Sequence, residues 1–208
     1  MLRCRTIGMT RLQSICVYCG SANGVRPAYV AGAQRLGAAM AAAGIRLVYG
    51  GGDVGLMGTV ARSVIDNGGR VTGIIPTFLQ RRERMLTDVE ELIVTKDMHE
   101  RKRLMFERAD AFVALPGGVG TLEELVEQLT WAQLGQHKKP IVLANIEGFW
   151  SRFLEILDHM RREGFIRAET AVDVMVVDDP DKVVPMIASA VEKISREQMR
   201  LSVAPNAL

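Results

Sequence analysis

Short apolar runs alternate with longer stretches of mixed polarity along almost the whole chain. Such runs, rich in valine, isoleucine and leucine, are typical of strands buried on both faces of a parallel sheet. Strands are predicted at 15–18, 47–49, 71–75, 92–94, 111–115, 141–144 and 174–177. Helical periodicity, with flanking Gly and Pro residues, predicts helices at 27–43, 56–66, 97–108, 125–131, 149–162 and 180–200.

The alternation of strands and helices predicts a doubly wound, Rossmann-like α/β fold built on a parallel sheet. No shift in composition divides the chain, so we expect a single domain over 14–200, with a flexible leader at 1–13 and a flexible tail at 201–208. Met9 is an alternative start to Met1. Ligands of such sheets bind beyond the carboxyl ends of the strands, which makes the turns after the strands the candidate binding positions.

Composition and charge narrow the class of protein. The 208 residues are 48% apolar and 24% charged, the balance of a globular protein with a substantial core. A net charge of +2 gives no reason to expect nucleic acid or an acidic membrane as a partner. No apolar run approaches the ~20 residues of a membrane span, and the N-terminus lacks the apolar segment of a secretory signal. We therefore expect neither nucleic acid nor a membrane as a partner.

Three cysteines, Cys4, Cys16 and Cys19, are too few for a disulfide framework. Redox and zinc motifs share the spacing of Cys16 and Cys19, but a zinc site needs a second pair that the sequence does not have. In a strand, an odd separation also sends two side chains to opposite faces. We expect structural cysteines in a reducing, cytoplasmic setting.

The segment Pro-Gly-Gly-Val-Gly-Thr-Leu-Glu-Glu at 116–124 joins a predicted buried strand to a predicted helix. Glycines let a ligand approach the backbone closely, and the N–H groups and dipole of a helix N-terminus favour a phosphate. The segment matches neither the P-loop pattern nor Gly-x-Gly-x-x-Gly. Ser21 and Gly50–Gly52 follow two other strands, so three such turns share one edge. A phosphorylated ligand, in particular a nucleotide, is expected there.

Glu124 has two interpretations. Thr121 and Glu124 have the spacing of a capping box, in which Thr caps the helix and Glu bonds back to the N–H of the cap. Alternatively, Glu123 and Glu124 are carboxylates placed directly behind a phosphate site. The local sequence leaves both interpretations open.

The helix predicted before the fifth strand carries the basic pair Arg101 and Lys102 near its N-terminus. On a helical projection Arg101 falls between Leu104 and Met105, so it points inward. A cation there opposes the helix dipole and needs an anionic partner, which a nucleotide or Glu124 would supply. The alternative is a solvated basic face of the helix.

Several of these motifs together resemble the LOG ("lonely guy") family of cytokinin-activating phosphoribohydrolases, long described as lysine decarboxylases. They are Tyr-Cys-Gly-Ser at 18–21, Gly-Gly-Gly-x-x-Gly-Leu-Met-Gly at 50–58, Met-His-x-Arg-Lys at 98–102, Pro-Gly-Gly-x-Gly-Thr-x-x-Glu at 116–124 and Trp-Ala-Gln-Leu-Gly at 131–135. The resemblance covers about 14–190. It implies hydrolysis of the N-glycosidic bond of AMP or N6-prenylated AMP, which yields the free base (a cytokinin) and ribose 5-phosphate.

The resemblance also implies roles for individual residues. Arg101 and Glu124 would form the catalytic pair, and no metal or other cofactor is implied. The substrate-binding positions, which include the serine and glycine turns, would be Ser21, Gly51, Glu83, Met98, Lys102, Gly117, Gly118, Val119, Gly120, Thr121, Glu123 and Thr130. The sequence around Glu83 departs from the family pattern. The family is at least dimeric, with the site completed across the subunit interface, so a homo-oligomer is expected.

The implied chemistry suits these residue types. Cleavage of a glycosidic bond builds positive charge on the ribose, and a carboxylate such as Glu124 stabilises that charge and orients or deprotonates the attacking water. Arg101 cannot donate a proton, because a guanidinium does not deprotonate in proteins. Its expected role is to hold Glu124 ionised and to bind ligand oxygens. The sequence does not identify the group that protonates the leaving base.

Two other functions compete with this one. A decarboxylase would need pyridoxal phosphate on a lysine, and the segment Gln136-His137-Lys138 offers a His-Lys pair, but at the edge of the sheet opposite the glycine turn. A non-catalytic purine nucleotide-binding module would share the glycine turns but would not require both Arg101 and Glu124. Release of adenine from AMP distinguishes an enzyme from such a module.

Overall fold

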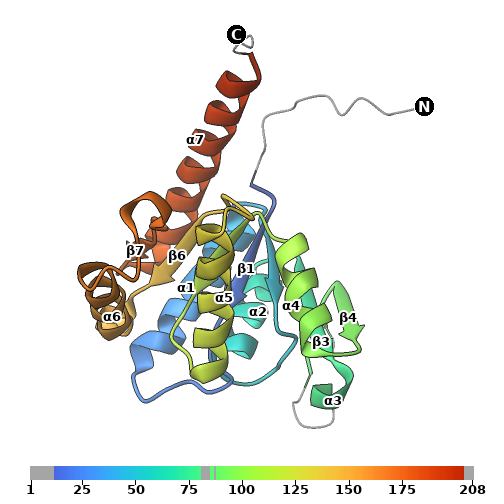
Figure 1. Cartoon of the computed structure of the whole chain (residues 1–208). Helices are drawn as coiled ribbons and strands as arrows, with labels where there is room; N and C mark the ends of the chain where they lie inside the picture. The colour runs from blue at the N-terminus through green and yellow to red at the C-terminus, as the bar shows by residue number, and fades with distance from the viewer. Residues whose placement is uncertain (1–11, 81–84, 87, 204–208) are drawn as a thin grey trace.

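The computed structural model describes residues 12–80, 85–86 and 88–203, and shows one parallel sheet with helices on both faces (Figure 1). The strands are β1 Ser14–Tyr18, β2 Arg46–Tyr49, β3 Val71–Pro76, β4 Glu91–Thr95, β5 Ala111–Ala114, β6 Ile141–Ala144 and β7 Met175–Val177. All neighbouring strands are parallel. The doubly wound α/β fold and the strands predicted from apolar runs are confirmed.

The helices match the predicted ones with two exceptions. Over the described residues they are α1 Pro27–Ala42, α2 Gly55–Asp66, α3 Thr77–Gln80, α4 Met98–Glu107, α5 Val119–Gln133, α6 Ser151–Arg162 and α7 Val183–Val203, with 3₁₀ turns at Ile146–Gly148, Ala168–Thr170 and Pro180–Lys182. The short α3 was not predicted. The start predicted for α5 is wrong, because this helix already begins within the glycine-rich segment. In the described ranges, none of the helices combines the length and the hydropathy that crossing a membrane requires.

The direction of winding changes between β1 and β5. The strand order is β4-β3-β2-β1-β5-β6-β7, so the chain winds outward from β1 to β4, returns past its starting point to β5, and winds outward again to β7. Figure 1 shows β1 in the middle of the sheet, close to α5. The turns that follow β1 and β5 therefore meet at the switch point, where ligands bind in open α/β sheets.

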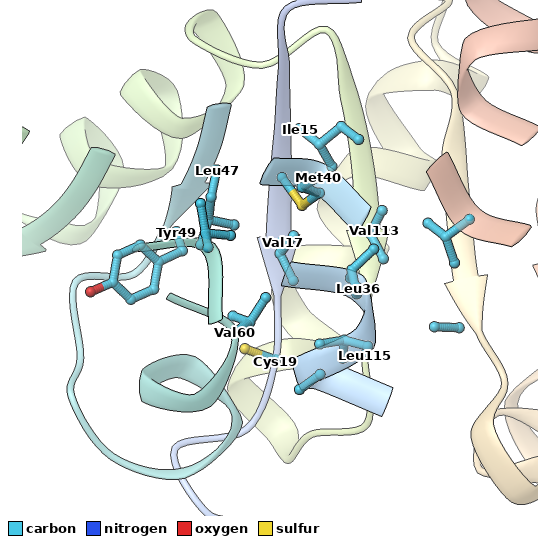
Figure 2. Close-up of a cluster of buried hydrophobic side chains, with 14 of the residues drawn as sticks. Ile15, Val17, Cys19, Leu36, Met40, Leu47, Tyr49, Val60, Val113 and Leu115 are labelled. Atoms are coloured by element: carbon cyan, nitrogen blue, oxygen red, sulfur yellow. The ribbon is translucent and has the colours of Figure 1, made fainter. Parts of the chain in front are cut away.

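Within the described residues, a buried apolar cluster lies on each face of the sheet. On one face, side chains of β1 and β2 such as Val17 and Leu47 pack against Leu36 and Met40 of α1 (Figure 2). On the other face, Phe112 of β5 is buried in a cluster that includes residues of α4 and α5. Successive residues of β1 serve the two clusters in turn, as the two-residue period of a strand requires.

The cysteine pair follows this alternation. Cys16 belongs to the cluster under α4 and α5, whereas Cys19 belongs to the cluster under α1 and α2. Both are free and buried, and burial raises the pKa of each thiol, which keeps it protonated. The predicted placement on opposite faces is confirmed, whereas Cys4 lies outside the described residues.

Candidate functional site

Three turns interlock at the carboxyl edge of the sheet. The N–H of Gly20, after β1, donates to the carbonyl oxygen of Pro116, after β5, at 3.0 Å. The N–H of Leu56, in the first turn of α2, donates to the carbonyl oxygen of Gly20 at 3.0 Å. Gly55 has a φ of +63°, and a Cβ there would collide with the backbone at Ser21. The predicted meeting of the three turns is thus confirmed.

The N-terminus of α5 is open at this edge. The helix begins at Val119 with Gly118 as N-cap, and among the described residues no side chain caps it. Gly118, Val119 and Gly120 are exposed, so the N–H groups of the first turn are accessible to a ligand. Thr121 is buried and packs against Gly117, where a Cβ would collide with the threonine side chain.

The capping-box interpretation of Glu124 is wrong. A capping box would make Thr121 the N-cap, but α5 starts two residues before Thr121, which places Glu124 in the second helical turn. Reciprocal capping occurs instead at α4. There Asp97 accepts from the N–H of Glu100 at 2.8 Å, and Glu100 accepts from the N–H of Lys96 at 2.9 Å.

A small cavity of about 220 Å³ lies on the side of the α5 N-terminus that faces α1. The loop after β1, the turn after β5 and three larger side chains form its wall. It is lined by Gly20, Ser21, Ala22, Asn23, Gly24, Tyr29, Leu56, Pro116, Gly117, Gly118 and Phe149. Three of the predicted binding positions, Ser21, Gly117 and Gly118, therefore border one hollow next to the helix N-terminus.

Arg101 points inward, as its position on the helical projection predicted. The residue is 7% exposed, and its Nε donates to the carbonyl oxygen of Ile74 at 3.1 Å. One terminal nitrogen lies 3.7 Å from the sulfur of Met98, and the other lies 3.7 Å from Oε1 of Glu124. The guanidinium lies against Gly50, where a Cβ would collide with it. A solvated basic face is therefore excluded for Arg101.

Glu124 is buried opposite this guanidinium. Burial raises the pKa of its carboxyl to about 7, whereas the Arg101 charge acts in the opposite direction and only partly offsets the effect. The expectation that Arg101 holds Glu124 ionised is therefore correct in direction, but burial is the larger influence. A carboxyl that titrates near neutral pH is suited to proton transfer.

Lys102 lies beside this pair and contacts two carboxylates of α5. Its Nζ donates to Oε1 of Glu123 at 2.6 Å and to Oε1 of Glu127 at 2.9 Å. Lys102 and Glu123 are predicted binding positions, but Glu127 is not. Its only signal in the sequence is helical spacing, because Glu127 follows Glu123 by four positions and therefore lies on the same face of α5.

The remaining predicted binding residues are not in contact with the Arg101–Glu124 pair among the described contacts. Gly51 follows β2 with a φ of +80° and packs against Ile75. Thr130 is exposed on the outer face of α5, where its hydroxyl donates to the carbonyl oxygen of Val126, so this chain does not bring it to Glu124. Glu83 lies outside the described residues.

The His-Lys pair lies at the opposite edge of the sheet, as predicted, because it precedes β6. His137 is buried between backbone groups, with Nε2 3.2 Å from the carbonyl oxygen of Gln128 and Nδ1 accepting from the N–H of Lys139. Lys138 is exposed. In the part of the chain that the structure describes, no group of three or more His, Cys, Asp or Glu side chains is placed to hold a metal ion.

Sequence comparisons agree with these motifs. A family model described as "Possible lysine decarboxylase" matches residues 57–187. Cytokinin riboside 5′-monophosphate phosphoribohydrolase LOG of Oryza sativa subsp. japonica is 51% identical to this chain over 167 residues, which cover 80% of this chain and 69% of the rice protein. Cytokinin riboside 5′-monophosphate phosphoribohydrolase LOG7 of Arabidopsis thaliana is 48% identical over 157 residues, which cover 76% of this chain and 72% of that protein.

Solved structures share the fold at lower identity. The Moco carrier protein from Chlamydomonas reinhardtii has a TM-score of 0.67 and 21% identity, over 88% of this chain and 99% of that one. The molybdenum cofactor binding protein from Rippkaea orientalis has a TM-score of 0.64 and 24% identity, over 87% of this chain and 98% of that one. At these identities the likeness concerns the fold alone.

Proposed function

Because the chain belongs to the LOG family of phosphoribohydrolases, we propose that it hydrolyses the N-glycosidic bond of AMP and of N6-prenylated AMP to the free base and ribose 5-phosphate. The observation that carries the proposal is the buried pair of Arg101 and Glu124 behind the open N-terminus of α5. The named relatives act on cytokinin riboside 5′-monophosphates. A decarboxylase has less support, because His137 and Lys138 lie at the opposite edge of the sheet from Arg101 and Glu124.

The substrate phosphate is proposed to bind at the N-terminus of α5. The exposed backbone at Gly118, Val119 and Gly120 presents N–H groups there, and the helix dipole favours an anion. Binding energy from the phosphate would then position the ribose, because interactions remote from the reacting bond can be used for orientation. This assignment predicts that a nucleoside without the phosphate is a poor substrate.

Glu124 is proposed to act in its ionised form. A negative charge beside ribose C1′ stabilises the positive charge that develops as the bond to the base breaks. The same carboxylate takes a proton from the water that attacks C1′, which a group with a pKa of about 7 can do at neutral pH. The water oxygen then bonds to C1′ as the bond to the base breaks, and the departing base takes up one proton, so that water adds as OH to the ribose and as H to the base. Arg101 orients this carboxylate and binds ligand oxygens, and the bond to Ile74 fixes the plane of its guanidinium.

We also propose that the protein acts in the cytoplasm as a homo-oligomer, at least a dimer, with the site completed by a second copy. The outer face of α5 supports this, because Val119 is 84% exposed, Leu122 and Val126 are exposed in the turns that follow, and Leu134 is exposed at the far end of the helix. Thr130 lies on the same outer face. A threonine that points away from its own site can serve the site of a neighbouring copy.

The test is base release from AMP, adenosine and N6-isopentenyl-AMP at equal concentration, with and without EDTA. We expect both nucleotides to release base, with the prenylated one better, and adenosine to react at least about tenfold more slowly, which corresponds to losing one charge-assisted phosphate contact. EDTA should change nothing. Adenosine cleaved as fast as AMP would refute the phosphate assignment, and AMP bound without release of adenine would favour a nucleotide-binding module.

A further inference from the structure

Lys102 takes part in a charged contact that the proposed mechanism does not yet use. Its ammonium lies between Glu123 and Glu127, and the side chain is 12% exposed. The two carboxylates are one helical turn apart, where like charges repel unless a cation lies between them. Lys102 provides this cation from the neighbouring helix, so α4 and α5 are joined here by three charges.

The two carboxylates have different surroundings. The side chain of Glu123 is 52% exposed, whereas that of Glu127 is 21% exposed. Oε1 of Glu127 accepts from Lys102, but its Oε2 is buried and finds no hydrogen-bond partner among the described residues. Glu123 can therefore exchange its partner with solvent or ligand, whereas Glu127 is held in one place.

Stability alone does not account for Glu127. Buried polar atoms nearly always have a partner, and a carboxylate oxygen without one destabilises the folded state. The contact of Glu127 with Lys102 instead holds the Lys102 ammonium next to the Arg101–Glu124 pair. The charge of Lys102 acts to lower the pKa of the Glu124 carboxyl, against burial and against the charges of Glu123 and Glu127, which raise it.

We propose that Glu127 is a positioning residue. When substrate binds, Lys102 exchanges its contact with Glu123 for contacts with substrate oxygens, and Glu127 keeps the Lys102 ammonium at the site. The identity of that substrate rests on the proposed function. The position of Lys102 does not, because all three contacting groups belong to this chain. Two measurements therefore separate the two proposals.

The first measurement needs no substrate. Lys102 is labelled with acetic anhydride and its reaction rate is read by mass spectrometry in the wild type, Glu127→Gln and the control Glu107→Gln. Glu107 pairs with Arg103 on the exposed side of α4, so its variant removes an ion pair of the same kind away from the site. We expect severalfold faster labelling of Lys102 in Glu127→Gln alone. An unchanged rate in a folded Glu127→Gln protein would overturn the proposal.

The second measurement is a double-mutant cycle on kcat/KM for AMP with Lys102→Gln and Glu127→Gln. Glu127→Gln alone should lower kcat/KM by roughly ten- to a hundredfold, the range seen when a supporting residue is removed. In the Lys102→Gln background it should change kcat/KM by less than about twofold, because Glu127 would act through Lys102. Additive losses would mean that Glu127 acts independently. If the wild type releases no base from AMP, the proposed function fails while the labelling result still decides the role of Glu127.

Discussion

Both edges of the sheet carry pairs of ionisable side chains, but the contacts of these side chains differ. At the carboxyl edge, Arg101 and Glu124 are buried, and a terminal nitrogen of Arg101 lies 3.7 Å from Oε1 of Glu124, which is too long for a hydrogen bond. At the amino edge, both ring nitrogens of His137 are engaged with backbone groups. There the Lys139 ammonium donates to the carbonyl oxygen of Phe106 at 2.7 Å and lies over the ring of that residue. His137 and Lys139 at the amino edge thus already have partners that a ligand would have to replace, whereas Lys138 is exposed.

Cavity size alone would favour the amino edge as the site. The amino edge has a hollow of about 450 Å³ between β6, β7 and α7, twice the volume of the one beside the α5 N-terminus. Its wall includes Lys138, Lys139 and Lys193, but also Asp173 and Glu197. Volume and a His-Lys pair therefore do not identify a site. A buried carboxyl whose pKa lies near neutral, beside an open helix N-terminus, is the more specific sign.

Removing the carboxylate is the strongest test of this contrast. Glu124→Ala should lower base release from AMP by about 10³-fold or more, because both charge stabilisation and proton transfer are lost. The fold should persist, since Glu124 does not cap α5. The measurement is kcat/KM alongside a circular dichroism spectrum. Normal turnover by the folded variant would remove Glu124 from the mechanism.

The geometry of Arg101 is the next test. Arg101→Lys should be nearly as damaging as Arg101→Ala, with a loss of about 10²-fold in kcat/KM, because an ammonium cannot contact Ile74 and Glu124 in the plane of a guanidinium. Steady-state kinetics on both variants decides this. Activity in the lysine variant alone would mean that only a point charge is needed, and activity in both would leave Arg101 without a role.

The buried carboxyl should also limit stability. Its pKa is about 7 in the folded protein against 4.5 as the ordinary value, so the folded state binds the extra proton between these values and loses stability as pH rises through about 7. The penalty above that pH is on the order of 3 kcal/mol. Glu124→Gln should therefore exceed the wild type in free energy of unfolding at about pH 8.5 and match it at about pH 4, as measured by urea denaturation.

The titration of Glu124 should also appear in the activity, which should rise with pH where stability falls. If the ionised form of Glu124 is the active one, kcat/KM rises with pH and levels off above about 7. A profile that falls through this range would mean that the protonated form is required. A difference in stability between wild type and variant that does not change with pH would place the carboxyl in a more polar environment.

The smallest effect is expected at the amino edge. Lys138→Ala removes an exposed charge from the His-Lys segment and should change base release by less than about twofold. The same protein, supplied with pyridoxal phosphate and lysine, should release no carbon dioxide in a manometric or coupled assay. Lysine decarboxylation that disappears in Lys138→Ala would reverse the assignment of the two edges.

The sequence by itself determined the strands, the doubly wound class of the fold and the direction of Arg101. These follow from periodicity, which is a local property. Apolar runs specify buried parallel strands, a two-residue period sends Cys16 and Cys19 to opposite cores, and a helical projection places Arg101 on the inner side of α4. The glycine turn predicted the open helix N-terminus for the same reason, since glycine reports the backbone conformation that it permits.

Only the tertiary structure decided where the carboxylates lie and which groups they contact. Thr121 and Glu124 have the spacing of a capping box, and the choice against it depends on the start of α5, which packing of Thr121 against Gly117 helps to set. The pKa of Glu124 depends on burial between α5 and the sheet. The contact of Glu127 with Lys102 joins two residues on different helices, 25 positions apart in sequence. Such distances depend on how separate elements pack together, and no local pattern of residues encodes them.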